Sequence, residues 1–143
     1  VELVKVLARH YWQINPEWKN LKSGQSSSGQ DLESLVAIGD KTFEISHHFP
    51  FVYDLAEAWI DFTGLPFVFA VWISRSQITT LVEEQFNRAL LYGINHKREC
   101  LDYFSDRLPA GIDCLSYLED NISYKFDAKK KQGLERFLGF LAK

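Results

Sequence analysis

The segment from Asp54 to Ser74 constrains the fold more than any other part of this sequence, because it joins several strong local signals. Asp54 and Glu57 have the spacing of a capping box, in which two side chains satisfy free amides of a first helical turn. Gly64 favours the left-handed end of a helix, and Pro66 prevents the helix from continuing. The apolar residues between them recur at helical spacing and predict one buried helix face: Leu55, Ala58, Trp59 and Phe62.

Residues 66–73 predict a buried strand. They read Pro-Phe-Val-Phe-Ala-Val-Trp-Ile, a run that is apolar on both faces and rich in aromatic and β-branched side chains. Such a strand is typically central, with helices covering both sides of the sheet. The run Leu-Val-Ala-Ile at 35–38 predicts a second, shorter strand. Strands that alternate with helices predict an α/β fold, with a mostly parallel sheet flanked by helices.

The other expected elements are mainly helices, and they become denser toward the C-terminus. We expect short extended segments at 17–21 and 122–126, and a polar loop at 22–30. We expect two parts, an α/β unit over residues 1–73 and a helical C-terminal part over residues 74–143. The expected helices cover residues 1–13, 41–45, 78–92, 96–105 and 112–120, with a last one capped by Asp127.

Composition narrows the class of protein. The chain has 143 residues and a net charge of −3, which argues against a nucleic-acid surface or a basic membrane helix. No apolar run reaches membrane-spanning length. Cys100 and Cys114 fit neither a disulfide framework nor a zinc site, so we expect a reducing, cytoplasmic compartment. The chain contains no methionine, and we expect it to be part of a longer protein.

The corner from Gly39 to Thr42 is the first candidate for chemistry. It follows the 35–38 strand, and ligands of open parallel sheets bind beyond the carboxyl ends of strands. Gly39 allows close backbone approach, and amides at a helix start suit a carboxylate or phosphate. Asp40 could hold a hydroxyl group, although the alternative is that it only caps the helix. Trp72, near the end of the strand expected at 66–73, is the other candidate.

Histidine and cysteine offer weaker signals. The adjacent His47 and His48 point in different directions, and no third ligand has a suitable spacing. His96 and Cys100 are four residues apart on an expected helix, but a structural metal site needs about four ligands. His10 is most simply a residue at the boundary of an apolar stripe. We therefore expect no metal site.

The central segment resembles one protein family closely. Tyr53-Asp-Leu-Ala-Glu-Ala-Trp59 and Thr63-Gly-Leu-Pro-Phe-Val-Phe-Ala-Val-Trp72 are similar to a segment of the MqnA-type menaquinone biosynthesis proteins, the chorismate dehydratases of the futalosine route. Val36-Ala-Ile-Gly-Asp40 resembles a strand and turn of that family, with Ala56 replacing a usual glycine downstream. Residues 1–12 and 117–124 also resemble segments of it, so the likeness covers nearly all of the chain.

The resemblance implies a two-lobed fold like that of type 2 periplasmic binding proteins, with the substrate in the cleft between the lobes. It implies a lyase that removes water from chorismate without a cofactor, and this chain matches the C-terminal part of a full member. Gly39, Asp40 and Thr42 would then lie at the edge of the substrate, and Trp72 would mark the crossover between lobes. No histidine is placed to act as the base, and the catalytic residue is unassigned.

Two alternatives stay open. A naphthoate synthase-like relative would share the implied fold, but its equivalent segment lacks the run at 67–72 and carries histidine at the turn. A solute-binding module for a small carboxylate would use the same cleft without catalysis. The sequence is also compatible with a homo-oligomer.

Overall fold

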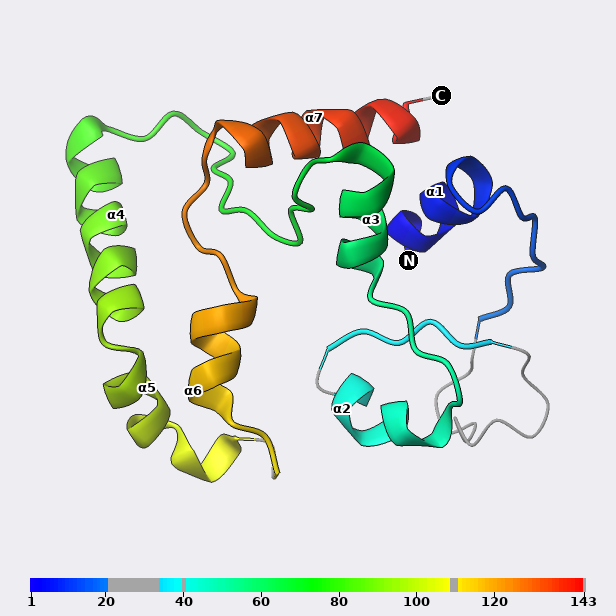
Figure 1. Ribbon diagram of the computed structural model, residues 1–143. Helices are drawn as coiled ribbons and strands as arrows, with labels where there is room; N and C mark the ends of the chain where they lie inside the picture. The colour runs from blue at the N-terminus through cyan, green and yellow to red at the C-terminus, as the bar shows by residue number, and fades with distance from the viewer. Residues whose placement is uncertain (21–33, 40, 109–110, 143) are drawn as a thin grey trace. The chain divides into compact units, whose positions relative to one another are not determined.

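The computed structural model describes residues 1–20, 34–39, 41–108 and 111–142 (Figure 1). Every regular element in these ranges is helical. The α-helices are α1 (Glu2–His10), α2 (Lys41–Ile45), α3 (Leu55–Thr63), α4 (Thr80–Asn95), α5 (Lys97–Tyr103), α6 (Cys114–Ser116) and α7 (Ala128–Leu141). Ser46–His48 and Ser105–Arg107 form single 3-10 turns, and Tyr117–Asn121 forms one π-helical turn.

The predicted α/β fold with a mostly parallel sheet is wrong, because the described residues contain helices and no strand. Residues 66–73 are extended, as their composition suggests, but they are not the buried centre of a sheet. Phe69, Trp72 and Ile73 are 75%, 76% and 86% exposed. A sequence pattern can favour an extended backbone locally, whereas a stable sheet also needs neighbouring strands. The two-lobed fold that included such a sheet loses its structural support for the same reason.

The described chain divides into two compact units. The first comprises Val1–Phe69 and Asp127–Lys143, and the second comprises Ala70–Phe126. The first unit contains the buried core, which lies between α1, α3 and α7 (Figure 1). The sequence analysis expected a different division, after residue 73, based on the lobes of the implied family fold. That division stays a prediction.

Trp59 is the centre of that core. Its side chain is fully buried, beside the fully buried Leu7 of α1. Four phenylalanine rings contact the indole edge-on, with centroid distances between 5.6 and 6.3 Å, and they are Phe62, Phe67, Phe137 and Phe140. Edge-to-face packing at this distance is favourable for aromatic rings. The predicted apolar face of α3 is therefore confirmed as the face that forms the core.

The predicted N-cap Asp54 and the predicted end of α3 at Gly64 are confirmed. The Asp54 carboxylate accepts hydrogen bonds from the amides of Ala56 at 2.7 Å and Glu57 at 3.3 Å. At the other end Gly64 has φ +70°, the left-handed conformation that only glycine adopts without cost. These two local signals determine where α3 begins and ends.

A glycine lets α7 approach the turn after α3. Gly133 is the buried residue of α7, and a Cβ atom added there would overlap the carbonyl oxygen of Pro66. The absence of a side chain at this point brings Phe137 and Phe140, one and two turns further along α7, against Trp59. The docking of α7 therefore depends on a residue that carries no side chain.

The second unit has no buried side chain among its described residues. Its longest helix, α4, begins at the N-cap Thr79, whose hydroxyl accepts from the Val82 amide at 3.4 Å. Within this unit the Trp72 ring contacts Phe86 of α4 edge-on at 5.3 Å. The helix expected at 112–120 is present as α6 followed by the π-helical turn.

Candidate functional site

The predicted corner at residues 39–42 is a tight turn that leads into α2. Gly39 has φ +72°, and its carbonyl oxygen accepts from the Thr42 amide at 3.0 Å and from the Thr42 hydroxyl at 2.8 Å. The structure thus joins Gly39 and Thr42 in one turn, and their role in binding a substrate stays a prediction. Because α2 has five residues, its backbone dipole contributes little to binding an anion at this corner.

The other two predicted site residues, Asp40 and Trp72, are not tested at this corner. Asp40 lies outside the described residues. Trp72 belongs to the second unit, whereas Gly39 and Thr42 belong to the first. Trp72 is exposed and contacts Phe86. The strand whose end it was expected to mark is absent from the described residues, and its role at a site stays a prediction.

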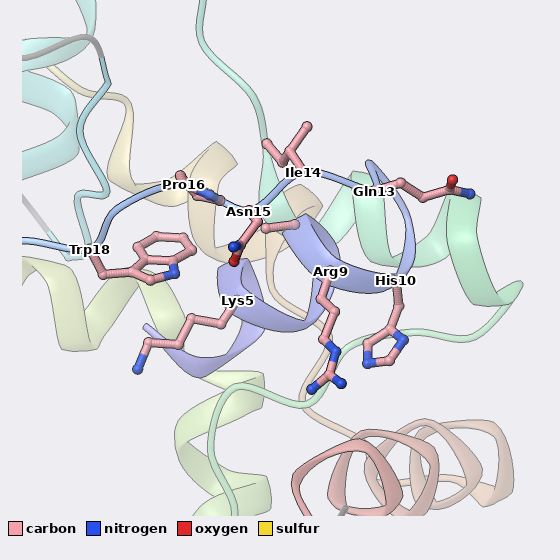
Figure 2. A pocket seen from close by; sticks show the side chains of 9 residues that line it. Lys5, Arg9, His10, Gln13, Ile14, Asn15, Pro16 and Trp18 are labelled. Carbon is pink, nitrogen blue, oxygen red and sulfur yellow. The ribbon is translucent and has the colours of Figure 1, made fainter.

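A hollow of about 800 Å³ lies over the C-terminal half of α1 (Figure 2). We call it the α1 hollow. Its floor is one face of α1, and its wall is the loop that follows the helix. Its lining residues are Lys5, Ala8, Arg9, His10, Gln13, Ile14, Asn15, Pro16 and Trp18.

The wall exists because the chain reverses direction after α1. Gln13 has φ +54°, a left-handed conformation that is uncommon for a residue with a side chain. The reversal lets the Ile14 amide donate to the Ala8 carbonyl oxygen at 2.8 Å. Pro16 then keeps the backbone before it extended, and the loop returns along α1 toward Trp18 (Figure 2).

The α1 hollow is positively charged. Lys5 and Arg9 are four residues apart, which places them on one face of α1, and Figure 2 shows Arg9 and His10 pointing the same way. The Lys5 ammonium donates to the Glu2 carboxylate at 2.8 Å, and this hydrogen bond lowers the pKa of Glu2. Within the described residues no carboxylate lies within ion-pair distance of Arg9 or His10.

Aromatic contacts extend the positive region from α1 to α7. The His10 ring lies 4.8 Å from the Phe140 ring, centroid to centroid, at an angle of 41°. The Arg136 guanidinium lies 5.2 Å from the centroid of the same ring, a distance typical of a cation–π contact. The Phe140 ring thus contacts both the His10 ring of α1 and the Arg136 guanidinium of α7.

A second, smaller hollow of about 250 Å³ has the opposite charge. It lies between the end of α1 and the first turns of α3. Its lining residues are Tyr11, Trp12, Val52, Tyr53, Asp54, Glu57, Ala58 and Asp61. Three carboxylates in one small space repel an anion, so this hollow does not suit a dicarboxylate substrate.

Sequence reasoning missed most of the α1 hollow. The interpretation of His10 as a boundary residue agrees with its exposure, but its neighbours were not selected as a site. Lys5 and Arg9 lie on the polar side of an amphipathic helix, which is normally a solvated face. The only signal in the sequence was the four-residue spacing of Lys5 and Arg9. That spacing does not show that the loop after α1 returns alongside these two side chains.

No group of three or more histidine, cysteine, aspartate or glutamate side chains among the described residues could hold a metal ion. None of the helices in the described ranges combines the length and the apolar character needed to cross a membrane.

Comparison with known proteins assigns the family. No solved structure matches the chain. The family described as menaquinone biosynthesis matches residues 1–143, which is consistent with the resemblance to MqnA-type chorismate dehydratases noted for Tyr53–Trp72. The chain belongs to this menaquinone biosynthesis family.

Proposed function

We propose that this protein dehydrates chorismate in menaquinone biosynthesis. The observation that carries the proposal is the family match over residues 1–143, and the motif at 53–72 gives it its specific form. The buried strand expected at 66–73 is wrong. The proposal rests instead on the family match and the motif, and neither of them requires that strand. The fitting cellular compartment is the cytoplasm, since Cys100 and Cys114 match no disulfide framework.

The reaction needs positioning and charge stabilisation more than a special cofactor. A proton leaves the ring carbon that bears the enolpyruvyl ether, and its electron pair forms the new ring double bond. The neighbouring C–O bond breaks, and the proton taken from the ring carbon is passed to the departing hydroxide, so that the two leave together as one water molecule. The product ring is aromatic. Because chorismate carries two carboxylates, one of them can accept the ring proton while the protein holds the molecule.

We assign Gly39, Asp40 and Thr42 to the edge of the substrate. The Thr42 hydroxyl donates to the Gly39 carbonyl oxygen in the free protein, and rotation of this hydroxyl would let it donate to a substrate carboxylate instead. Asp40 would accept a hydrogen bond from the substrate hydroxyl in the ground state and so orient the bound molecule. We also assign Trp72 to substrate binding, on the resemblance alone. We assign no catalytic base.

The test is a direct assay of chorismate consumption with the purified protein, in which the aromatic product is separated and quantified. Asp40→Asn and Thr42→Val should each lower kcat/KM about tenfold, the effect of losing one hydrogen bond made to a charged group. Asp102→Asn on α5, an exposed residue, is the matched control and should leave kcat/KM unchanged.

The other outcomes separate the alternatives. Binding of chorismate with no loss of chorismate would support a solute-binding module and reject the lyase. Neither binding nor consumption would favour a naphthoate synthase-like relative, whose substrate differs. Unchanged kcat/KM in Asp40→Asn would remove that residue from the site.

A further inference from the structure

We propose that the α1 hollow is a binding site for a small aromatic carboxylate. The carboxylate would lie between Lys5 and Arg9, and the ring would lie against Trp18. The inference concerns the first unit alone and requires no turnover, so it stands or falls independently of the proposed dehydration.

The charge of the hollow selects an anion. Three of its lining residues, Lys5, Arg9 and His10, carry nitrogen donors on one turn and a half of α1 (Figure 2). None of the nine lining residues is acidic. Glu2 pairs with Lys5, which leaves Arg9 without a carboxylate partner in the described chain. The planar guanidinium of Arg9 suits a carboxylate, because both can form two parallel hydrogen bonds.

The loop wall selects a ligand with a flat apolar part. Trp18 is 44% exposed, and Figure 2 shows its indole beside Lys5 at one end of the hollow. Pro16 adds apolar surface along the same wall, and Asn15 contributes an amide between the two ends. Ile14 also lines the hollow, although Figure 2 shows its side chain pointing away from Lys5 and Arg9. A ligand pocket commonly combines apolar walls with a few polar groups that orient the ligand. A free phosphate would use the cations but would leave this apolar wall without a partner.

The size of the hollow is compatible with such a ligand. Its volume of about 800 Å³ lies in the range of small-molecule sites, roughly 300–1,000 Å³. The space is more than one benzoate-sized ring requires, so a substituted ring would also fit. Because the neighbouring hollow at α3 is lined by three carboxylates, a carboxylate ligand would be directed to the α1 side of the unit.

The first experiment measures the affinity of benzoate for the purified protein by calorimetry, at low ionic strength. We expect one benzoate per chain. Arg9→Gln should weaken binding about tenfold, the loss expected for one charge-assisted interaction. Arg9→Lys should retain an intermediate affinity, since it keeps the charge and loses the planar fork.

Lys19 supplies the matched control for Lys5, because each of these lysines forms an ion pair with its own glutamate. Lys5 pairs with Glu2 at 2.8 Å and lines the hollow, whereas Lys19 pairs with Glu17 at 3.3 Å and does not line it. Lys5→Gln should weaken benzoate binding several-fold, and Lys19→Gln should leave it unchanged. Equal effects of the two substitutions would show a general charge effect and overturn the assigned site.

Two further ligands test the class. Cyclohexanecarboxylate and inorganic phosphate should bind more weakly than benzoate, and the Trp18→Ala variant should lose the preference for benzoate. Failure of benzoate to bind the unmodified protein, or phosphate binding as tightly as benzoate, would overturn the proposal. Chorismate turnover is measured separately in Arg9→Gln, so a failed dehydratase assay leaves the binding result intact.

Discussion

The docking of α7 gives the sharpest test of how the first unit is held together. Gly133 is buried, and a Cβ atom at this position would overlap the Pro66 carbonyl oxygen. The clashing atom belongs to the backbone of the turn after α3, so no side-chain rotation can relieve the overlap. Gly133→Ala must therefore push α7 away from α3 or distort the turn, and it should separate Phe137 from Trp59.

The magnitude follows from two opposing effects. Overpacking of a core position costs about 1–3 kcal/mol, while replacing a helical glycine by alanine stabilises a helix by about 1 kcal/mol. Gly139 lies on the same helix, is exposed, and has no atom within 4 Å of an added Cβ. Gly139→Ala should show the helix gain alone. The two variants should therefore differ in free energy of unfolding by about 1–3 kcal/mol, with Gly133→Ala the less stable.

The assay is thermal and urea unfolding of both variants, followed by circular dichroism. A difference of this size corresponds to several degrees in Tm for a chain of 143 residues. Near-ultraviolet circular dichroism should also change in Gly133→Ala, because the aromatic cluster around Trp59 loses its packing. If Gly133→Ala is as stable as Gly139→Ala, the close approach of α7 to the Pro66 turn is wrong.

Three other substitutions test the structure. Gln13→Gly should stabilise the chain by up to about 1 kcal/mol in urea unfolding, because glycine adopts φ +54° without the cost that glutamine has; Gln13→Ala should show no such gain. Trp59→Ala should cost about 3–5 kcal/mol, whereas Trp72→Ala, at an exposed position, should cost under about 1 kcal/mol; equal costs would contradict the assigned core. The Lys130 amide donates a hydrogen bond to the Asp127 carboxylate and lowers the pKa of that carboxyl. The ionised carboxylate therefore stabilises the folded chain above about pH 4, and this stabilisation is lost as the pH falls through the lowered pKa. Asp127→Asn keeps a cap and should flatten the acid limb of a stability–pH curve; an unchanged limb would contradict this role.

The predictions that were confirmed depend on interactions between residues close in sequence. The cap at Asp54, the end at Gly64 and the start of α7 at Asp127 each involve a hydrogen bond or a backbone angle within a few residues. The expected start of α4 near residue 78 is also close to its observed N-cap, Thr79. Local signals of this kind specify helix ends before any tertiary contact forms.

The candidate site was only partly accessible from sequence. The turn at Gly39 and Thr42 that leads into a helix was expected, because a glycine before a helix start is again a local signal. The contact of these residues with a substrate stays a prediction. The α1 hollow was missed, since it arises where the Gln13 reversal brings Trp18 back to Lys5. A glutamine gives no signal in the sequence that it will adopt a positive φ. Without the positive φ of Gln13, the loop would not turn back along α1.

The sequence alone determined the approximate position of the helices, the caps at Asp54 and Asp127, and the family. These depend on side-chain periodicity, on hydrogen bonds to the first amides of a helix, and on one specific motif. It did not determine what the apolar run at 66–73 contacts. Burial on both faces requires other segments at the right distance, and the described structure uses Phe67 in the Trp59 cluster while leaving Phe69 and Trp72 exposed. The close approach of α7 and the charged hollow over α1 were likewise decided by tertiary structure, since each joins residues that no local pattern connects.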